Sequence, residues 1–315
     1  MLASTTTSIQ YAVDAIAFGS LFAVMALGLA LLFNVMGLMN FAYGELIMAG
    51  GYTMFYTRGL GWLGMVAMTI LVVTVLSLLM ELVAFRPLRR ASAVTLLISS
   101  FAVSYGLQQL GWMTVGKGPQ KGVEPYPWLT RQMDIGGVLI SRLAIMTMCV
   151  AVVLLVGMTL LIRRTALGIQ LRASTEDFHM AQLVGVRANR VIAAAFGITG
   201  LLASAVALLY VLRTGAVDPE IGRAPLLIAF VGGVIGGLGS LAGAALGGFV
   251  LGAMITALEA TLPATLASHT LLFAFLAVIA ILVLQPQGLI AVRTGVVGHA
   301  WRRLRRGAVV EGARA

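Results

Sequence analysis

The chain has 315 residues, of which 60% are hydrophobic and 10% are charged, and its mean hydropathy is +1.01. Soluble globular domains contain about 45–50% apolar and about 25% charged residues, so this composition excludes an ordinary soluble domain and predicts a helical membrane protein. The single cysteine excludes a disulfide framework and a thiolate metal cluster. Basic residues on the inner face of a membrane explain the net charge of +10, which requires no nucleic-acid partner.

The predicted fold class is all-α, a polytopic bundle of transmembrane helices with about eight spans, including broken or re-entrant segments. A helix needs about 17–25 predominantly apolar residues to cross the hydrocarbon core of a bilayer. In chain order, the apolar segments lie at residues 12–33, 44–57, 61–84, 93–115, 143–162, 191–212, 225–262 and 270–284. The segment 44–57 is short and polar for a span, and 225–262 is long for one span but short for two.

Polar residues interrupt the apolar pattern between the first two segments, at Asn34, Asn40, Tyr43 and Glu45. Such groups are costly to bury in a membrane and usually face a cavity or a partner. One interpretation is a polar turn at the membrane interface, with Gly37 and Gly44 as hinges. The other interpretation is a gating segment that lines the transport pathway.

A second polar stretch, residues 172–190, separates two apolar spans and has the features of a short capped helix. Ser174 is the predicted N-cap, with Asp177 at the spacing of a capping box. Glu176 and Asp177 place negative charge at the positive end of the helix dipole, and Gly185 is the predicted C-terminal stop. A helix of about ten residues is only about 15 Å long, which is too short to cross a bilayer. We therefore expect this helix to present a face to a soluble partner protein.

The apolar segment 225–262 is rich in glycine and contains a predicted break at Gly236, Gly237, Gly239 and Ser240. Non-helical backbone at membrane depth is tolerated where it is buried in protein or lines a cavity. Glycines also recur at four-residue spacings, which lets helix backbones approach closely. The predicted packing set is Gly232, Gly236, Gly239, Gly243 and Gly247. The contact is either ordinary packing within the chain or packing against a second membrane subunit.

The distribution of lysine and arginine predicts the orientation. Three basic residues lie in 86–90, five in 163–190 and six in the tail 293–315, against seven in the loops on the other side. The side that is richer in basic residues is expected to be cytoplasmic. The loop 163–190 and the C-terminus are therefore predicted inside, and the N-terminus and the loop 116–142 outside. The predicted organisation is a membrane domain over 1–292 followed by a basic cytoplasmic tail.

Four blocks of sequence carry a resemblance to a known family. These blocks are GLALLFNVMGLMNFAYGEL at 28–46, ELVAFRPLRRAS at 81–92, TALGIQLRASTEDFHMAQLVGVRANRV at 165–191, and a C-terminal pair, VGGVIGGLGSLAGAALGG at 231–248 with LQPQGLI at 284–290. In this order they resemble the H-type permease subunits of branched-chain amino-acid ABC importers, the LivH-like family. Tyr43 stands where a histidine is usual in that family.

The resemblance implies a permease subunit that translocates branched-chain or related amino acids across the bacterial inner membrane. It also implies three kinds of partner: a second related permease, two cytoplasmic ATPase subunits and a periplasmic substrate-binding protein. The coupling motif implied for the ATPases is Arg172, Ala173, Asp177, Ala181 and Gly185, to which Ser174 and Glu176 are added as the expected start of the helix. The chain contains no G-x-x-x-x-G-K-[ST] motif, so we expect it to use no cofactor and the partner subunits to bind ATP.

Two other classes of protein fit the sequence less well. An enzyme would need a nucleophile–base pair or a set of metal ligands, and the three histidines lie in different regions of the chain. We therefore expect neither an enzyme nor a metal site. A free-standing secondary transporter is compatible with the hydropathy alone, but such proteins usually carry an ionisable residue at mid-membrane. Within the importer class, urea, short amides and aromatic acids are the alternative substrates.

Overall fold

The computed structural model describes residues 2–37, 39–88, 91–115, 120–121, 123, 126–135, 138–176, 180–181, 186–263, 266 and 269–284. Over these residues the chain is almost entirely helical. The long helices form because hydrocarbon offers no hydrogen-bond partners, so each apolar segment must satisfy its backbone internally.

The first half of the chain consists of helices joined by short turns, and α2 packs against α3. Its helices are α1 (Leu2–Met36), α2 (Tyr43–Thr57), the short 3₁₀ turn η1 (Arg58–Leu60), α3 (Gly61–Met80), the π-helical turn η2 (Glu81–Phe85) and α4 (Ala93–Val115). Helix α1 ends at Gly37, which has a φ of 71° and donates its N–H to the carbonyl of Phe33 at 2.8 Å. This left-handed cap is accessible to glycine and closes the first span.

The second half begins with small elements at one end of the bundle. These are β1 (Gln120–Lys121), α5 (Pro127–Thr130), β2 (Gln132–Ile135), β3 (Val138–Ser141) and, later in the chain, β4 (Ala216–Val217). Strands β2 and β3 form an antiparallel hairpin, and β1 pairs with β4. The helices are α6 (Arg142–Arg164), α7 (Ala166–Glu176), α9 (Ala188–Thr214), α10 (Arg223–Gly236), α11 (Leu241–Thr261) and α12 (Thr270–Leu284).

Six of the described segments are long and apolar enough to cross a membrane. They are Ile9–Met36, Tyr43–Phe85, Ala93–Val115, Arg142–Arg164, Asn189–Thr214 and Leu241–Thr261. Two further apolar helices are shorter: α10, which is the first part of the apolar segment 225–262, and α12. The 43-residue segment contains both α2 and α3, with Gly61 at a φ of 75° between them. The multi-span helical fold is therefore confirmed, and the number of about eight spans stays a prediction.

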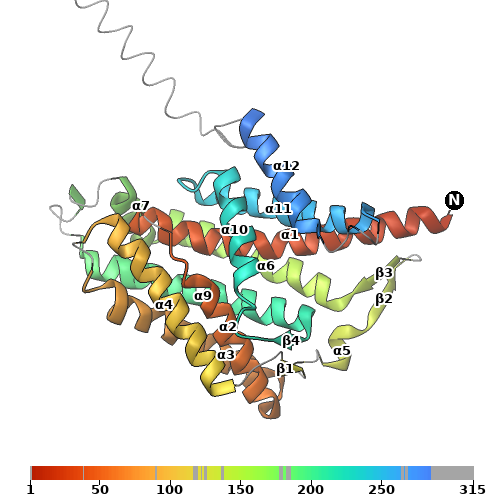
Figure 1. The fold of residues 1–315 in the computed structure, drawn as a ribbon, viewed down its shortest axis with the longest axis horizontal. Helices are drawn as coiled ribbons and strands as arrows, with labels where there is room; N and C mark the ends of the chain where they lie inside the picture. Colours follow the sequence, from red (N-terminus) through yellow and green to blue (C-terminus); the bar gives the residue numbers. More distant parts are fainter. Residues whose placement is uncertain are drawn as a thin grey trace, which may run out of the picture.

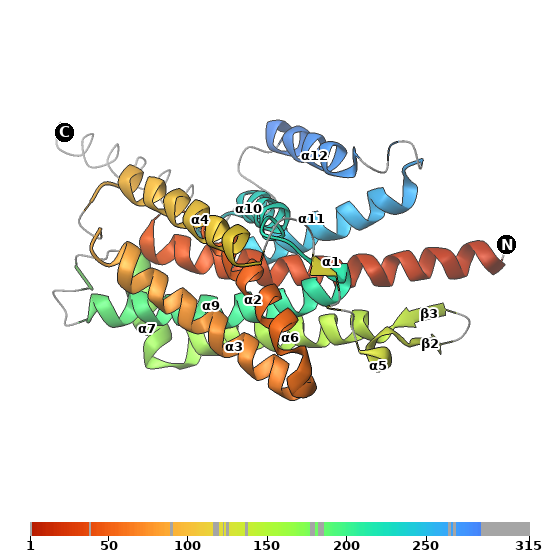
Figure 2. The same cartoon turned by 60° about the horizontal axis from the view of Figure 1, so that its bottom comes forward.

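Helix α1 is the centre of the bundle. It is buried over most of its length and contacts α6, α9, α10 and α11. Figure 2 shows α10, α11 and α12 on one side of α1 and α6, α7 and α9 on the other. Glycines allow the close approach of α1 and α11, because a Cβ on Gly19 would lie 2.6 Å from the carbonyl oxygen of Phe249. Both views place the N-terminus, α5 and the β2–β3 hairpin at one end of the molecule and α7 at the other (Figures 1 and 2).

The glycine-rich segment is a broken helix pair. Helix α10 ends at Gly236 and α11 begins at Leu241, with the Ser240 hydroxyl accepting a hydrogen bond from the N–H of Gly243 at 3.2 Å. The break therefore lies where the sequence predicted it, and the hydroxyl provides the N-cap of α11.

The two helices of this pair cross through backbone contacts. A Cβ on Gly232 would lie 2.7 Å from the Cα of Gly248, and Cβ atoms on Gly236, Gly243 or Gly247 would collide with backbone atoms of the facing helix. Gly239 takes no part in this packing within the chain: a Cβ there would meet nothing within 4 Å, because Gly239 lies in the connecting turn rather than on a helix face.

Candidate functional site

Three of the four polar residues predicted around the start of α2 are buried. Asn40, Tyr43 and Glu45 are at most 3% exposed. The side-chain oxygen of Asn40 accepts a hydrogen bond from the N–H of Ala42 at 3.1 Å, which turns the chain into α2. The Tyr43 hydroxyl, packed next to Gly28, has no hydrogen-bond partner among the described residues. The chain therefore enters α2 inside the protein, and this segment is not a turn exposed to solvent.

The two predicted hinges behave differently. Gly37 has the left-handed backbone that a hinge would need. The prediction for Gly44 is wrong, because Gly44 lies within α2, where a Cβ would come 2.9 Å from the carbonyl oxygen of Gly222. Gly44 is therefore a contact between α2 and the start of α10.

Asn34 is separate from the other three residues. Its side-chain amide donates to the carbonyl of Ala30 at 2.7 Å and to the carbonyl of Leu238 at 2.8 Å. The second bond ties the end of α1 to the turn between α10 and α11. Asn34 thus satisfies a backbone carbonyl that the broken helix leaves unpaired.

Helix α4 presents a row of polar side chains to α2 and α10. Ser100, Ser104 and Gln108 follow each other at four-residue spacing, which places them on one helix face. The Ser104 hydroxyl donates to Oε1 of Glu45 at 2.9 Å, and the Ser100 hydroxyl accepts from the N–H of Phe41 at 3.4 Å. The row therefore anchors the buried entry to α2.

Arg223 extends this polar contact to the first residue of α10. Its guanidinium donates to Oε1 of Gln108 and forms a 3.0 Å ion pair with Glu220. The amide of Gln108 in turn donates to the carbonyl of Pro219 at 3.2 Å. These bonds fix α4 to the segment that leads into α10.

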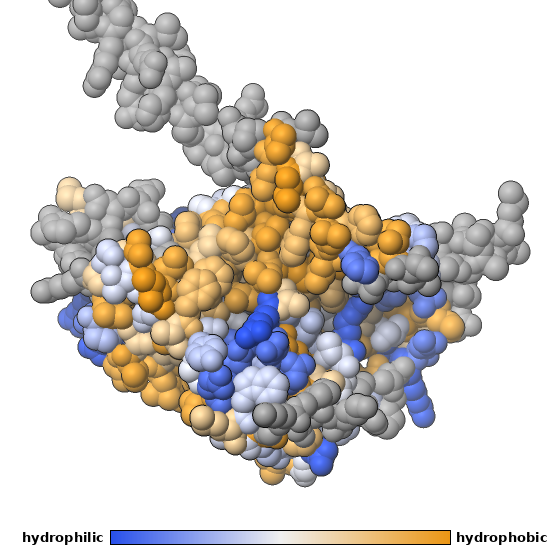
Figure 3. Space-filling model, viewed as in Figure 1, coloured by the Kyte–Doolittle hydropathy of each residue, from blue (hydrophilic) through white to orange (hydrophobic). Residues whose placement is uncertain are grey.

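A cavity of about 290 Å³ lies between α2, α4 and α10, and we call it the polar pocket. Its polar wall consists of Glu45, Ser104, Gln108 and Arg223, and its apolar wall includes Phe41, Phe101, Leu226 and Leu227. The Phe41 and Phe101 rings are stacked with centroids 4.3 Å apart. Figure 3 shows hydrophilic residues gathered in the middle of the face, directly below a large apolar area and near the lower end of α10 in Figure 1.

The sequence alone identified only one polar member of this pocket, Glu45. In the sequence, Ser104 and Gln108 lie within an ordinary apolar segment, 93–115, and Arg223 lies just before the segment 225–262. A signal was present for the first two, since polar residues at four-residue spacing in an apolar span predict a face turned away from lipid. No local pattern indicated Arg223.

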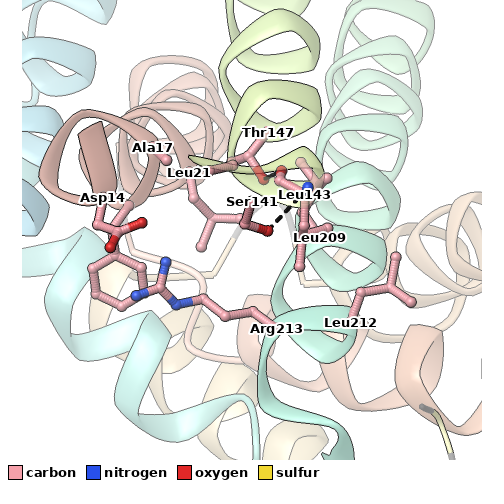
Figure 4. Close-up of a pocket in the computed structure, with 11 residues that line it drawn as sticks. Asp14, Ala17, Leu21, Ser141, Leu143, Thr147, Leu209, Leu212 and Arg213 are labelled. Atoms are coloured by element: carbon pink, nitrogen blue, oxygen red, sulfur yellow. Dashed lines mark hydrogen bonds between the residues drawn. The ribbon is translucent and has the colours of Figure 1, made fainter. Parts of the chain in front are cut away.

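A second cavity of about 300 Å³ lies between α1, α6, α9 and the end of β3. Figure 4 shows Asp14 and Arg213 on its walls, with the Ser141 hydroxyl accepting a hydrogen bond from the N–H of Leu143. The guanidinium carbon of Arg213 lies 4.3 Å from the centroid of the Phe18 ring. This contact, in the last turn of α9, is a favourable place for a cation. Three helices therefore border this cavity, at the end of the bundle where the N-terminus lies.

Most of the predicted coupling helix after Glu176 lies outside the described residues, apart from Met180 and Ala181. The helix that the structure describes in this loop is α7, which begins earlier. Helix α7 runs from Ala166 to Glu176, and the hydroxyl of Thr165 accepts a hydrogen bond from the N–H of Gly168 at 3.0 Å. The prediction of Ser174 as N-cap is therefore wrong: Ser174 lies inside α7 and donates its hydroxyl to the carbonyl of Gln170 at 2.8 Å. Thr165 has the capping role because the apolar residues that hold α7 to the bundle begin directly after it.

The described residues of the expected coupling motif are partly exposed. Arg172 and Ala173 are exposed on α7, whereas Leu171 and Ser174 are buried against the bundle. Glu176 is the last residue of α7, and Ala181, which is 6% exposed, accepts a hydrogen bond from the N–H of Val186 through its carbonyl. Asp177 and Gly185 lie outside the described residues.

Arg172 also lines a small cavity with Asn34 and Gly239. This cavity of about 170 Å³ brings α7, the end of α1 and the α10–α11 turn together. A movement of α7 would therefore change the walls of this cavity at the break in the glycine-rich helix pair.

Comparison with known proteins places the chain in a family. Residues 11–284 match the family described as "Branched-chain amino acid transport system / permease component". The chain belongs to this family. The permease resemblance that was read from the four sequence blocks is thus confirmed over most of the chain.

Several curated permeases are similar over most of their length. The high-affinity branched-chain amino acid transport system permease protein BraD of Pseudomonas aeruginosa is 33% identical over 257 residues, covering 77% of this chain and 83% of BraD. The corresponding LivH protein of Escherichia coli K12 is 29% identical over 297 residues, covering 90% and 95% of the two chains. A probable LivH of Methanocaldococcus jannaschii is 26% identical over 297 residues, with 93% of each chain covered. These relatives are named as transport permeases, not as enzymes.

Part of the chain is also similar to a permease of a different transport system. The xylose transport system permease protein XylH of Escherichia coli is 35% identical over 104 residues, or 31% of this chain and 26% of XylH. No solved structure matches the chain.

Proposed function

We propose that this permease is the membrane-spanning subunit of an ATP-driven importer of branched-chain or related amino acids in the bacterial inner membrane. The observation that carries the proposal is the family match over residues 11–284, together with relatives named for branched-chain amino acid transport. In this proposal a second, related permease subunit completes the membrane part. A periplasmic binding protein delivers the substrate, and two cytoplasmic ATPase subunits supply the energy.

The proposed orientation places the N-terminus outside and α7 inside. The excess of basic residues in the loops on the α7 side supports it. The separation of the N-terminus and the β2–β3 hairpin from α7 agrees with a two-sided arrangement (Figures 1 and 2).

Helix α7 is the proposed docking element for the ATPases. Its buried residues Leu171 and Ser174 fix it to the bundle, while Ile169 and Ala173 share an exposed face. Exposed apolar side chains on a short helix at the end of a membrane protein suit contact with another protein. The proximity of Arg172 to the α10–α11 turn gives a route from this contact to the interior.

Reconstitution of the importer tests the proposal. The permease, co-expressed with the ATPase, second-permease and binding-protein genes beside it, would be purified as a complex and placed in proteoliposomes. We expect uptake of labelled leucine that requires both ATP and the binding protein, with urea, acetamide and phenylacetate as alternative probes. Uptake driven by an ion gradient without ATP would contradict the proposal and favour a secondary transporter. ATP-dependent uptake of one of the other probes, but not of leucine, would retain the importer and replace its substrate.

A further inference from the structure

The polar pocket lies on a surface that lipid alone would not tolerate. Arg223 and Glu220 have side chains about half exposed, at 53% and 49%, and the exposed apolar side chain of Leu227 borders the same pocket as Arg223. Charged groups at such a place normally face a water-filled cavity or a protein partner, because exposing them to hydrocarbon is costly. The pocket is therefore part of a hydrated or protein-covered surface of the importer.

The pocket contains two opposite charges. Its positive pole combines the Arg223 guanidinium with the positive end of the dipole of the 14-residue helix α10, which favours an anion. Its negative pole is the carboxylate of Glu45, a residue that is only 3% exposed. The Arg223 guanidinium also forms a 3.0 Å ion pair with Glu220, which does not line the pocket.

Glu45 is the more informative of the two poles. Its Oε1 accepts the hydrogen bond from Ser104, but its Oε2 has no hydrogen-bond partner among the described residues. A buried carboxylate oxygen without a partner is costly, and a positively charged donor would remove that cost. This oxygen is covered from solvent, so Glu45 contributes a carboxylate with an unmet hydrogen bond to the wall of the pocket, where a cationic group is favoured.

The remaining wall of the pocket is apolar. The stacked rings of Phe41 and Phe101 and the side chains of Leu226 and Leu227 border the same cavity of about 290 Å³. Small-molecule sites commonly combine such an apolar lining with a few placed polar groups that fix the orientation of the ligand.

We propose that the polar pocket binds the transported amino acid as a zwitterion. The ligand's carboxylate pairs with Arg223 and the start of α10, its ammonium group pairs with Glu45, and its apolar side chain packs against Phe101 and Leu227. This inference rests on the proposed importer function, and it adds a residue-level site and a requirement for both charges. A neutral amide would satisfy neither pole fully.

Photolabelling of the purified complex tests the site directly. The probe is photo-leucine, a diazirine analogue of leucine that keeps both charges, added to the complex in detergent without the binding protein. Selection by the binding protein then does not contribute. We expect ultraviolet light to label peptides of α4 or α10 that contain Phe101, Tyr105 or Leu227. We also expect leucine to compete at least about tenfold better than leucinamide or 4-methylpentanoate, each of which lacks one charge.

Charge-removing variants provide the second measurement. Glu45→Gln keeps the shape of the side chain and is expected to reduce labelling about ten- to a hundredfold, because it removes a charge-assisted hydrogen bond. Arg223→Gln should reduce labelling similarly, and Arg223→Lys should recover part of it. The matched control is Glu259→Gln, which changes the same chemical group at an exposed position near the end of α11 and should label normally. Gel filtration of each variant with its ATPases reports on folding.

The outcomes separate this inference from the proposed function. If the wild-type complex imports leucine with ATP but photo-leucine labels no pocket peptide, the site is overturned and the importer stands. Equal competition by leucine and leucinamide, or normal labelling of a well-assembled Glu45→Gln variant, also overturns it. If the complex imports no amino acid at all, the proposed function fails and this site fails with it.

Discussion

Tyr43 lies at a position that suggests a role in transport, but its surroundings indicate a structural role. It stands where a histidine is usual in the resembling family, yet it is fully buried and does not line the polar pocket. A Cβ on Gly28 would lie 2.6 Å from its hydroxyl oxygen, so ring and glycine fit each other closely. We interpret Tyr43 as a packing residue between α1 and α2.

This interpretation predicts that Tyr43→Phe keeps full transport. The hydroxyl has no partner among the described residues, so its removal should leave stability unchanged or raise it by about 1–3 kcal/mol. Tyr43→Ala should instead cost about 3–5 kcal/mol, because it leaves a large cavity. Thermal stability in detergent and leucine uptake in proteoliposomes measure both effects. A well-folded Tyr43→Phe protein with tenfold slower uptake would show that the hydroxyl belongs to the pathway.

Gly243 and Gly239 form a matched pair four residues apart. A Cβ on Gly243 would collide with the carbonyl oxygen of Gly236, whereas a Cβ on Gly239 would meet nothing within 4 Å. We predict that Gly243→Leu forces α10 and α11 apart and costs at least about 1–3 kcal/mol, and that Gly239→Leu changes stability little. The monodisperse fraction after heating, read by size-exclusion chromatography, compares the two variants. Equal stability of the two proteins would remove the packing argument.

Among the helices, α7 shows how packing selects one of two possible N-cap residues. Both Thr165 and Ser174 are suitable N-cap residues, and the acidic residues after Ser174 favoured the later start. The helix begins after Thr165 because Leu171 can then be buried against the bundle. Short helices are marginal in water, so tertiary packing rather than local charge decides where this one begins.

The exposed face of α7 gives the test of coupling. Ile169 is 58% exposed, and Ala173 is exposed one turn further along. We predict that Ile169→Glu with Ala173→Glu leaves membrane insertion intact but abolishes co-purification with the ATPase subunits and uptake, because the new charges would be buried in the contact. Gln170→Glu, on a different face of the same helix, is the control and should retain both. Normal ATPase binding by the double variant would exclude this face of α7 as the docking surface.

At the scale of the whole molecule, the arrangement predicts two chemically distinct sides. Single cysteines at Ala173 and Arg131, both at exposed positions, would report on them in a Cys149→Ser background. We expect an impermeant thiol reagent to label the cysteine at 131 in intact cells and to label the one at 173 only after the cells are opened. The reverse pattern would invert the proposed topology.

The sequence by itself determined the membrane class, the apolar segments and the break in the glycine-rich pair. These features are local: a long apolar segment in hydrocarbon must be helical, and adjacent glycines with a serine cap stop one helix and start the next. The four family blocks likewise lie along the chain, so the family could be recognised without coordinates.

Only the tertiary structure decided the polar pocket. Glu45 and Ser104 are 59 residues apart, and Gln108 and Arg223 are 115 residues apart. Their association depends on how α2, α4 and α10 pack, which no local pattern encodes. The same holds for Gly239: its spacing matches that of its neighbours, but the chain turns there and leaves it outside the helix crossing. A sequence period gives the face of a residue only while the helix continues, and the structure decides where it ends.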